Sequence, residues 1–357
     1  MTISFAAARD LASRTSGMDG GEAGEFLDLL MAATLDVADG AALLVALAER
    51  GETAAELAAM VRGLLERAVR IPPATRCLDL CGTGGSGLSR FNVSTTAAFV
   101  LAAAGIPVAK HGNRGSVRPN GSFDFLDAVG IPFAQTPRAH AELLERTRLC
   151  FLFARAMHPA VAAVAPYRKA AGRRTIFNLA GPLANPCRPA RQIIGVSSWA
   201  TAGVIAGALR ELGVERALVV RGEPGIDEYS VSGDTRWLEV TPSGVVEGFR
   251  RSGPGVPYAD IPGGDAGDNA ASFARLFAGE GPQALLDLVA LNAAAALDLW
   301  RDRPILADGA SLAEATELIV SGRALRSFQD HQRLARDLGA VAPGGLPGTP
   351  GLGSAKS

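Results

Sequence analysis

Apolar residues recur at helical spacing from Phe5 to about Arg70, for example in GEFLDLLMAATL and in DGAALLVALAERGETAAELAAMVRGLLERAV. No run of β-branched residues interrupts this pattern, so it favours amphipathic helices over strands. Pro72 and Pro73 then interrupt the chain, and the short apolar run RCLDL that follows has the length of a strand. The pattern therefore predicts a small all-helical domain over residues 1–72, with the domain boundary at the two prolines.

From residue 73 onward, short apolar runs alternate with stretches of helical spacing. The runs IPVAK, LCFLFA and QIIGVS are followed in turn by FDFLDAVG, AVAAVAPYRKAAG and AGVIAGALRELG, and RALVVRG comes next. Such alternation is typical of a mostly parallel central sheet flanked by helices, so we predict a larger α/β domain over residues 73–341. We expect the loops of this sheet to carry the functional site.

The last third of the chain predicts different elements. The segment EYSVSGDTRWLEVTPSGVVEGF has the pattern of hairpin strands, and residues 282–300, 311–321 and 324–338 have helical patterns. The final residues, 342–357, are rich in glycine and proline and predict a disordered tail.

Composition and charge argue against several classes of function. Lys+Arg number 35 and Asp+Glu number 36, so no overall positive field attracts a nucleic acid, and nucleic-acid binding is not expected. The longest run of small apolar residues, 95–109, contains glycine and proline and is shorter than the roughly 20 residues of a membrane span. The N-terminus carries Arg9 and Asp10 where a signal peptide has its apolar core. We therefore expect no membrane segment and a cytoplasmic location.

The stretch DLCGTGGSGLSRFNVSTT, residues 79–96, places four glycines within six residues directly after a predicted strand. A glycine-rich turn exposes backbone N–H groups, and the N-terminus of a following helix adds free donors, so phosphate is the expected ligand. The loop lacks the Lys-Ser/Thr of a P-loop, and its G-x-G-G-x-G spacing differs from the dinucleotide fingerprint. For the glycines alone, a tight turn without a ligand is the alternative.

Hydroxyl and amide side chains follow the glycines where a helix is predicted to begin. They are Asn92, Ser94, Thr95 and Thr96. One of them suffices to cap the free backbone donors of the helix. The others could bind phosphate oxygens, and Ser94 could coordinate magnesium, which prefers oxygen ligands. We therefore favour ligand contact over capping alone.

A cationic segment, KHGNRGSVRPNG, continues from the predicted strand IPVAK. Lys110, His111, Asn113, Arg114 and Arg118 crowd into a loop bounded by glycines. The apolar residues before them place Lys110 at the C-terminal end of a strand, where parallel sheets bind ligands. We predict a polyanion clamp here, with His111 as a candidate catalytic residue. A solvated charged loop is the alternative.

Two adjacent carboxylates, Asp227 and Glu228, lie on a predicted loop after the strand RALVV. Adjacent carboxylates repel each other unless a cation lies between them. In a chain that also has a phosphate loop, the pair favours a site for magnesium bound together with a phosphorylated substrate. For the pair alone, a solvated acidic turn is the alternative.

Eight segments then combine into a family pattern. They are, in order, DLCGTGGSG, FNVSTT, KHGNRG, GSFDFLDAVG, FLFARAMHPAV, RKAAGRRTIFNLAGPLANP, GIDEYSV and SGRAL. Together they closely resemble the anthranilate phosphoribosyltransferase family, and the resemblance runs through nearly the whole chain. GTGG, KHGNR and RTIFNLAGPLANP separate it from the related pyrimidine nucleoside phosphorylases, which share the fold but carry a different lysine-loop motif.

The resemblance implies a reaction and an assembly. The donor would be phosphoribosyl pyrophosphate, the acceptor anthranilate, and the cofactor magnesium, with two ions per subunit. The site would lie between the helical and α/β domains, and a homodimer would form mainly through the helical domain, which helices from about residues 159–185 would join. Because an aromatic amine is unprotonated at neutral pH, its attack on C1 of the ribose requires no strong base.

The resemblance also implies roles for individual residues. The donor would contact Gly82, Thr83, Gly84, Gly85, Asn92, Ser94, Thr95 and Lys110. The magnesium ions would bind Ser94, Asp227 and Glu228. The acceptor would contact His111, Asn113, His158, Arg168 and the turn formed by Gly181 and Pro182, with Arg168 on the anthranilate carboxylate. Lys110 and His111 would be the catalytic residues.

Four positions depart from the family pattern. Ser86 replaces the aspartate that usually follows Gly-Thr-Gly-Gly, Val117 and Arg118 replace a pair of serines, and Met157 stands where an aromatic residue is common. These differences leave two alternatives open. One is a divergent phosphoribosyltransferase with another small aromatic acceptor, and the other is a non-catalytic relative that binds phosphorylated ligands or nucleic acid.

Overall fold

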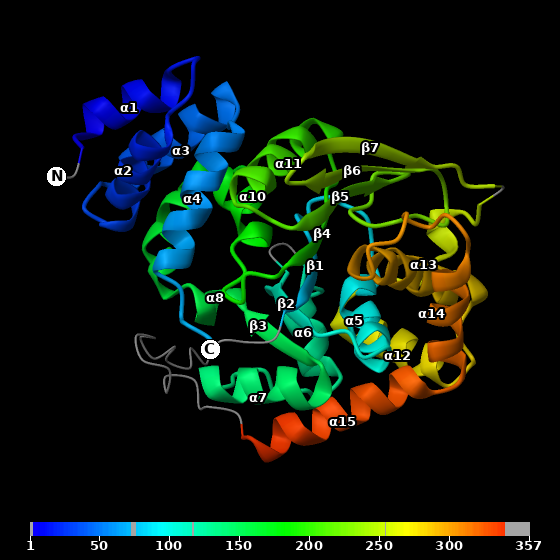
Figure 1. Cartoon of the computed structure of the whole chain (residues 1–357). Helices are drawn as coiled ribbons and strands as arrows, with labels where there is room; N and C mark the ends of the chain where they lie inside the picture. Colours follow the sequence, from blue (N-terminus) through cyan, green and yellow to red (C-terminus); the bar gives the residue numbers. More distant parts are fainter. Residues whose placement is uncertain (1–2, 73–75, 116–117, 254, 340–357) are drawn as a thin grey trace.

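A seven-stranded sheet forms the centre of the molecule (Figure 1). The computed structural model describes residues 3–72, 76–115, 118–253 and 255–339. The strands are β1 (Leu78–Gly82), β2 (Val108–Gly112), β3 (Leu149–Phe153), β4 (Arg191–Gly195), β5 (Arg216–Gly222), β6 (Thr235–Thr241) and β7 (Gly244–Arg250), in the order β3-β2-β1-β4-β5-β6-β7. The first five are parallel, and β6 and β7 extend one edge as an antiparallel hairpin. The predicted α/β class, with a mostly parallel sheet, is confirmed.

Seven helices share one core with one face of the sheet, and four of them form the lobe at the upper left of Figure 1. The lobe contains α1 (Phe5–Ser13), α2 (Gly20–Met31), α3 (Val37–Arg50) and α4 (Ala54–Glu66), and the other three are α9 (Ala165–Ala171), α10 (Ile176–Leu183) and α11 (Ala202–Glu211). α4 packs against α10 and α11, and α11 packs against β5 and β6. The predicted helical pattern over residues 5–70 is therefore confirmed as four helices.

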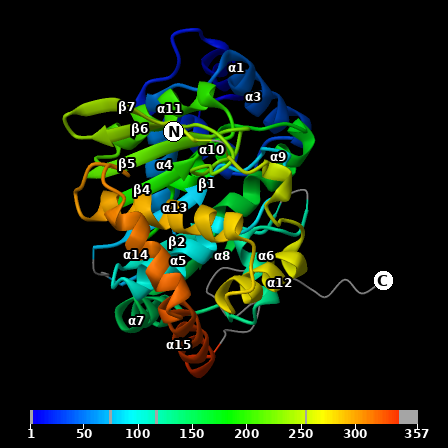
Figure 2. The same cartoon turned by 90° about the vertical axis from the view of Figure 1, so that its right-hand side faces the viewer.

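The other face of the sheet carries a second core, which Figure 2 shows from the side. Its helices are α5 (Val93–Ala103), α6 (Ser122–Ala128), α12 (Ala266–Phe277), α13 (Gln283–Trp300), α14 (Ala310–Val320) and α15 (Arg323–Asp337). Of the described helices, α13 alone has the length and apolar composition of a membrane span, but 78% of it is buried inside the fold. Core packing therefore accounts for its composition. The three helices predicted near the C-terminus are confirmed to within one residue at each end.

Some predicted elements differ from the structure. The segment AVAAVAPYRKAAG is a 3₁₀ turn, η1 (Pro159–Val164), followed by the short α9 rather than one helix. Pro159 and Pro166 explain the break, because proline cannot donate the hydrogen bond of a helix interior. The first strand begins at Leu78 and runs into the glycines, two residues later than predicted.

Four short elements have no clear apolar pattern and were not predicted. They are α7 (Pro137–Thr147), α8 (Ala154–Met157), η2 (Trp199–Thr201) and η3 (Tyr258–Asp260). α7 buries only Ala139, His140, Leu143 and Leu144, so its exposed polar residues obscure the helical spacing. The predicted tail over residues 342–357 and part of the predicted domain boundary, residues 73–75, lie outside the described residues.

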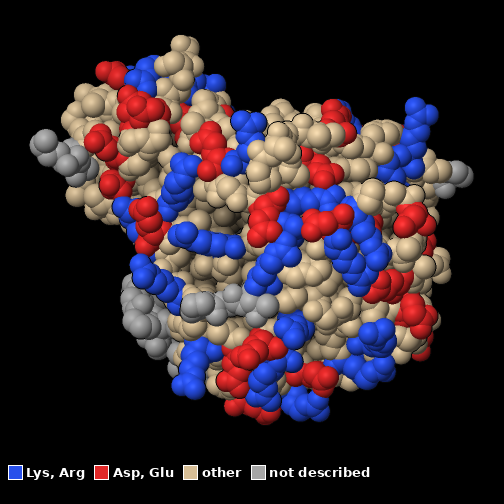
Figure 3. Space-filling model, viewed as in Figure 1, with Lys and Arg blue, Asp and Glu red and all other residues tan. Residues whose placement is uncertain are grey.

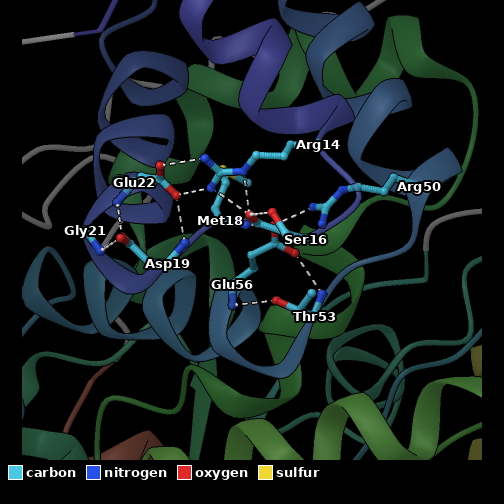
Figure 4. A network of polar contacts seen from close by, with 10 residues as sticks. Arg14, Ser16, Met18, Asp19, Gly21, Glu22, Arg50, Thr53 and Glu56 are labelled. Atoms are coloured by element: carbon cyan, nitrogen blue, oxygen red, sulfur yellow. Dashed lines mark hydrogen bonds and ion pairs between the residues drawn. The ribbon is translucent and has the colours of Figure 1, made fainter.

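A buried carboxylate ties the N-terminal helices together (Figure 4). Glu56, in the first turn of α4, is fully buried and accepts hydrogen bonds from the N–H groups of Met18 (2.8 Å) and Thr53 (2.8 Å). It also forms an ion pair with Arg50, whose Nε donates to the Ala12 carbonyl (3.0 Å). Because Arg50 ends α3 and Ala12 belongs to α1, this one carboxylate connects α1, α3, α4 and the loop before α2.

Candidate active site

The loops that the sequence singled out meet where the strand order reverses. The chain runs from β1 outward to β2 and β3, and then returns to β4 and β5 on the other side of β1. In such sheets, ligands bind in the crevice at the carboxyl ends of the two strands that flank the reversal. Two hydrogen bonds join the loops after β1 and β4 there, from the Thr83 N–H to the Gly195 carbonyl (2.8 Å) and from the Ser197 hydroxyl to the Gly84 carbonyl (3.1 Å).

Glycine is required in this crevice for two different reasons. Gly84 and Gly85 have φ angles of +67° and +81°, in the left-handed region that side chains disfavour. Gly82 and Gly195 leave space instead, because a Cβ atom would lie 2.1 Å from Asp227 Oδ2 at Gly82 and 1.7 Å from the Asp227 carbonyl oxygen at Gly195. The missing side chains let Asp227 lie directly against the ends of β1 and β4.

Asp227 and Glu228, which we call the acidic corner, lie in different surroundings. The Asp227 side chain is 5% exposed, accepts a hydrogen bond from the Gly84 N–H at Oδ2 (2.9 Å) and forms an ion pair with Arg90 at Oδ1. Glu228 is partly exposed, and burial together with the charge of Asp227 raises its pKa to about 8. A carboxyl group with so high a pKa has too little positive charge nearby to stabilise its ionised form.

The acidic corner does not by itself form a complete metal site. Within the described ranges, no group of three or more His, Cys, Asp or Glu side chains is placed to hold a metal ion. A hard cation at the corner would therefore need further oxygen ligands from hydroxyl groups, substrate or water. All the side-chain donors at the corner are carboxylate oxygens, which is the ligand type that magnesium prefers.

The loop between the glycines and α5 is held from the C-terminal half of the chain. The Tyr258 hydroxyl donates to the Ser89 carbonyl (3.0 Å), and the Asn269 amide donates to the Arg90 carbonyl (3.0 Å). Asn269 also donates to Asn92 Oδ1 (2.9 Å), and Asn92 donates to the Asn120 carbonyl (3.0 Å). The side chain of Asn92, the N-cap residue of α5, thus connects the start of α5 with the segments that contain Asn120 and Asn269. It makes no side-chain capping bond.

The hydroxyl groups at the start of α5 differ in accessibility. α5 begins at Val93, as predicted. Ser94 is partly exposed, whereas Thr95 and Thr96 are fully buried and their hydroxyls have no hydrogen-bond partner among the described residues. Ser94 is therefore the hydroxyl of this turn that a ligand can reach directly.

Lys110 lies near the C-terminal end of β2, as predicted, whereas His111 also belongs to the strand rather than to the following loop. β2 stays paired with β3 as far as Gly112, which keeps both residues in the strand. Lys110 is 1% exposed and its Nζ donates to the Leu80 carbonyl (2.5 Å). Asp79 is close to it, and burial raises the pKa of Asp79 to about 6 and lowers the pKa of Lys110. Lys110 and Asp79 form a buried pair of opposite charges at the start of the glycine loop.

Asp79 also connects β2 with the segment after α10. Its Oδ1 accepts a hydrogen bond from the His111 N–H (3.2 Å), and its Oδ2 accepts one from the Asn185 amide (2.9 Å). Asn185 donates a second hydrogen bond to the Ala109 carbonyl (2.7 Å). These contacts fix the backbone of β2 on both sides of Lys110.

His111 and His158 form a pair beside α10, with ring centroids 5.2 Å apart. His111 Nδ1 lies 3.2 Å from the Gly181 carbonyl, and His158 Nε2 lies 2.7 Å from the Ala184 carbonyl, so both nitrogens donate. In the described part of the chain, His111 Nε2 and His158 Nδ1 have no partner. Burial and the neighbouring His158 lower the pKa of His111 to about 3, so the neutral His111 ring can accept a hydrogen bond at Nε2.

Gly181 and Pro182 belong to α10 and do not form the predicted turn. Pro182 is near the end of this eight-residue helix, where the absence of its N–H costs one hydrogen bond and does not prevent the last turn. The carbonyls of Gly181 and Pro182 still reach the site, since they lie near His111 Nδ1 (3.2 Å) and Cys81 Sγ (3.6 Å), respectively.

Arg168, in α9, lies over the Phe177 ring with its Cζ 5.6 Å from the ring centroid. Burial and the nearby Arg155 lower its pKa, and no carboxylate is among the groups that act on it. Arg168 is therefore a partly buried cation whose charge no described side chain balances. Such a guanidinium is suited to a planar carboxylate ligand.

Arg114, predicted as part of a polyanion clamp, has carboxylate partners within the chain. Its guanidinium pairs with Asp124 (3.0 Å) and Asp127 (2.5 Å) of α6, so its charge fixes that helix. Asn113 Oδ1 accepts the Arg114 N–H (2.9 Å), which shapes the loop after β2. Arg118 is exposed. Positive and negative side chains alternate over the face drawn in Figure 3, which agrees with the balanced composition.

The positions that depart from the family pattern have different surroundings. The Ser86 hydroxyl accepts the Leu88 N–H (3.3 Å), which makes a local turn within the glycine loop. Met157 is 1% exposed and packs in a core cluster with Leu152 and Leu143. Val117 lies outside the described residues.

A cavity of about 480 Å³ lies at the opposite ends of the strands and is lined by residues such as Arg62, Arg188 and Glu215. None of the predicted site residues lines this cavity.

Several residues of the site were not predicted from the sequence. Asp79, Asn185, Arg90 and Asn269 all make contacts that hold the predicted residues. For Asp79 and Arg90, position was the available signal, because they lie on either side of the glycines. The sequence offered no comparable signal for Asn185 and Asn269, which reach the site from distant segments.

The fold and the site together define a class of enzyme. A glycine loop at the reversal of a parallel sheet, with an acidic corner and a separate unbalanced arginine, is suited to a phosphorylated donor and an anionic acceptor. Consistent with this, residues 74–325 match the family model described as "Glycosyl transferase family, a/b domain".

Comparison with known proteins gives the family. The chain is 44% identical over 288 residues to anthranilate phosphoribosyltransferase of Sphingopyxis alaskensis, covering 80% of this chain and 86% of the relative. It is 40% identical over 323 residues to that of Shouchella clausii, covering 89% and 94%. The crystal structure of the Thermus thermophilus enzyme superimposes with a TM-score of 0.83 at 38% identity, covering 92% of this chain and 99% of that one. The chain belongs to the anthranilate phosphoribosyltransferase family.

A more distant structure shares the fold. Anthranilate phosphoribosyltransferase of Saccharomyces cerevisiae, solved in complex with PRPP and Mg, has a TM-score of 0.81 at 22% identity, covering 93% of this chain and 98% of that one. This chain is accordingly a phosphoribosyltransferase that acts on anthranilate, as the names of its relatives indicate.

Proposed function

We propose that this chain carries out magnesium-dependent phosphoribosyl transfer from phosphoribosyl pyrophosphate to the amine of anthranilate at the crevice between β1 and β4. The proposal rests on the contact between the acidic corner and the glycine loop, in which Asp227 accepts a hydrogen bond from the Gly84 N–H (2.9 Å). This arrangement brings the carboxylates of the acidic corner and the backbone of the glycine loop to the edge of one crevice. A sugar pyrophosphate bound with a cation suits both.

The donor's pyrophosphate would lie along the glycine loop. Gly82, Gly84 and Gly85 carry no side chains of their own, which would let the donor approach the backbone of the loop. Ser94 and Asn92 lie at the start of α5, whose free N–H groups attract anions. Thr83 carries a hydroxyl without a described partner, which a bound donor would supply. Thr95 is fully buried, so its proposed part in donor binding would come from its place in the first turn of α5.

Lys110 would act from within the sheet. Its Nζ is held by the Leu80 carbonyl and lies near Asp79, so its charge is fixed in place before the donor binds. A fixed positive charge near the leaving group stabilises the negative charge that develops there without reorganisation.

Magnesium fits the donor set of the acidic corner. Asp227, Glu228 and Ser94 offer oxygen ligands, and Glu228 has a pKa raised to about 8 that a neighbouring cation would lower. We propose two ions per subunit, shared between the corner and the donor. Bound magnesium would supply charge neutralisation for the departing pyrophosphate.

The acceptor would bind on the side of α9 and α10. Arg168 would pair with the carboxylate of anthranilate, and His111 and His158, with Asn113 and the Gly181–Pro182 end of α10, would surround its ring. The free Nε2 of His111 would accept a hydrogen bond from the attacking amine. The C1–O bond to pyrophosphate breaks, the C1–N bond forms, and the amine proton leaves to solvent. Holding both substrates in line supplies much of the rate acceleration.

We also propose a cytoplasmic location and a homodimer formed through the lobe of α1 to α4. The dimer follows from the family resemblance, and Val37 at the start of α3 is an apolar side chain that is 48% exposed on this lobe. An exposed apolar residue on a lobe away from the crevice is compatible with a subunit contact.

Arg168→Ala tests the acceptor half of the proposal. Loss of a charged hydrogen-bond partner costs about 1.5–3 kcal/mol, so the KM for anthranilate should rise about 10- to 150-fold while the KM for the donor changes little. Turnover is followed by the loss of anthranilate fluorescence. Arg173→Ala is a matched control, because Arg173 is exposed and paired with Glu49 at 3.2 Å.

Two results would contradict the proposal. The first is an absence of phosphoribosyl anthranilate formation by the wild type, with other small aromatic acids accepted instead. The second is an equal rise of both KM values in Arg168→Ala, which would assign Arg168 to folding or domain closure.

A further inference from the structure

Arg90 is the one guanidinium, among the described side chains, that forms an ion pair with the acidic corner. It stands between the glycine loop and α5, and its side chain is 27% exposed against 5% for Asp227. Its Nη2 passes 4.0 Å from the position that a Cβ on Gly84 would take. The guanidinium therefore lies across the glycine loop, inside the crevice.

The backbone of Arg90 is fixed while its side chain is not. The Asn269 amide donates to its carbonyl (3.0 Å), and Tyr258 donates to the carbonyl of the preceding residue, Ser89 (3.0 Å). A Cβ on Gly263 would lie 2.9 Å from the Arg90 backbone, so that segment packs tightly against it. The side chain can change partner without any movement of the loop.

Both oxygens of Asp227 have partners within the chain. The Gly84 N–H takes Oδ2 (2.9 Å), and Arg90 takes Oδ1. A divalent cation at Oδ1 would lie close to the guanidinium, and the repulsion between the two positive charges disfavours binding of both. Arg90 and the metal thus compete for one carboxylate oxygen.

A pyrophosphate offers Arg90 another partner at the same place. A guanidinium presents five N–H donors in a planar fork that matches phosphate oxygens. When the pyrophosphate lies on the glycine loop, Arg90 can transfer its hydrogen bonds to it and leave Oδ1 free. Donor binding and metal binding would then favour each other, and this coupling is reciprocal.

We propose that Arg90 is a positioning residue whose ion pair with Asp227 hinders the binding of a divalent cation to that carboxylate. When the donor binds, its pyrophosphate replaces Asp227 as the partner of the guanidinium, and the carboxylate can then bind the cation. The inference rests on the proposed role of Asp227 as a magnesium ligand. Its consequence is that free metal binds weakly and that metal and donor bind together. If the Arg90–Asp227 pair is formed about nine-tenths of the time, it lowers the apparent metal affinity about tenfold.

The experiment measures Mn²⁺ binding to the donor-free protein by electron paramagnetic resonance. Arg90→Ala should bind Mn²⁺ about tenfold more tightly than the wild type. Arg90→Gln, which keeps polar atoms but removes the charge, should behave in the same way and guards against a folding defect in the alanine variant. Arg236→Ala is the matched control, because Arg236 is exposed on the β6–β7 hairpin and paired with Glu247 (2.9 Å). It should leave Mn²⁺ affinity unchanged.

A second measurement addresses the transfer to pyrophosphate. At saturating magnesium, Arg90→Ala should bind phosphoribosyl pyrophosphate about tenfold or more weakly, because it lacks a charged hydrogen-bond donor. Unchanged donor affinity would overturn the transfer of the guanidinium to pyrophosphate. Unchanged Mn²⁺ affinity in both Arg90 variants would overturn the claim that the Arg90 ion pair hinders metal binding at Asp227.

Asp227→Asn separates this inference from the proposed metal site. If this variant loses Mn²⁺ binding while the Arg90 variants gain none, the metal site stands and the role of Arg90 is wrong. If Asp227→Asn binds Mn²⁺ as the wild type does, the metal site itself is wrong.

Discussion

The carboxylate of Asp227 can reach its position only because Gly82 has no side chain. A Cβ on Gly82 would lie 2.1 Å from Asp227 Oδ2 and 2.8 Å from its Cγ. Such distances are too short for any non-bonded contact, so the carboxylate would have to move away from the glycine loop. The position of the acidic corner therefore depends on one residue that contributes no functional group.

We expect Gly82→Ala to impair donor use far more than it affects the fold. Displacing a catalytic group by about 1 Å can cost about 100-fold in rate, so kcat/KM for phosphoribosyl pyrophosphate should fall by about that factor. Steady-state kinetics and far-ultraviolet circular dichroism provide the two readouts. Gly203→Ala serves as control, since Gly203 lies in α11 and a Cβ there meets nothing within 4 Å. Wild-type kinetics in Gly82→Ala would contradict the prediction that a Cβ at this position displaces the Asp227 carboxylate from where it acts.

At this scale, the sequence predicts residues better than it predicts their partners. The glycine loop and the pair Asp227 and Glu228 can be recognised in the sequence because the residues that form each feature are close together along the chain. The contact between Arg90 and Asp227 joins residues 137 positions apart, and the contact between Asn185 and Asp79 joins residues 106 apart. Nothing in either local segment indicates such a pairing, because tertiary packing decides it.

At the scale of helices and strands, the hydrophobic pattern was sufficient where one face of an element is buried. It located α13, α14 and α15 to within one residue and identified the β6–β7 hairpin. It was insufficient where proline divides a helical pattern, as at Pro159 and Pro166, and where few residues are buried, as in α7. It ended the second strand at Lys110, two residues before the end of β2, because the contacts that bury the polar His111 come from elsewhere in the chain.

The N-terminal helices depend on Glu56 for their arrangement. Removing this carboxylate leaves Arg50, whose side chain is 8% exposed, as an unpaired buried charge. Breaking a buried ion pair from one side costs about 3–5 kcal/mol, so Glu56→Ala should lower the free energy of unfolding by about that amount. Urea titration followed by circular dichroism measures the change.

Glu49→Ala is the matched control for this prediction. Glu49 lies on α3 and pairs with Arg173, but its side chain is 63% exposed. Exposed ion pairs contribute about 1 kcal/mol or less, so this variant should remain close to the wild type. Equal stability of Glu56→Ala and Glu49→Ala would contradict the structural role of the buried carboxylate.

For the whole molecule, the strand order brings the separate motifs into one crevice. The sequence predicts a parallel sheet, but it does not fix that β1 and β4 become neighbours. That pairing joins the glycine loop to the segment after β4, and Asp227, which follows β5, then lies against both. The family resemblance predicts that these residues act together, and the sheet order brings their segments to the same crevice.

The residues proposed for the two substrates lie on different elements. The proposed donor residues belong to the loop after β1, α5 and the acidic corner, whereas the proposed acceptor residues Arg168, His158 and Gly181 belong to α8 to α10 and their connections. His111 in β2 reaches the acceptor side through its contact with Gly181 (3.2 Å). The reaction therefore depends on the sheet holding these two groups of residues in a fixed relation.

Binding of phosphoribosyl pyrophosphate, measured by isothermal titration calorimetry with magnesium and with a chelator, tests the central claim most directly. The account predicts that removing magnesium weakens donor binding to the wild type by at least about tenfold, because the cation shares the charge of the pyrophosphate. In the double variant Asp227→Ala and Glu228→Ala, affinity should be weak and the same under both conditions. Equal affinity of the wild type with and without magnesium, or full magnesium dependence in the double variant, would contradict the acidic corner as the metal site.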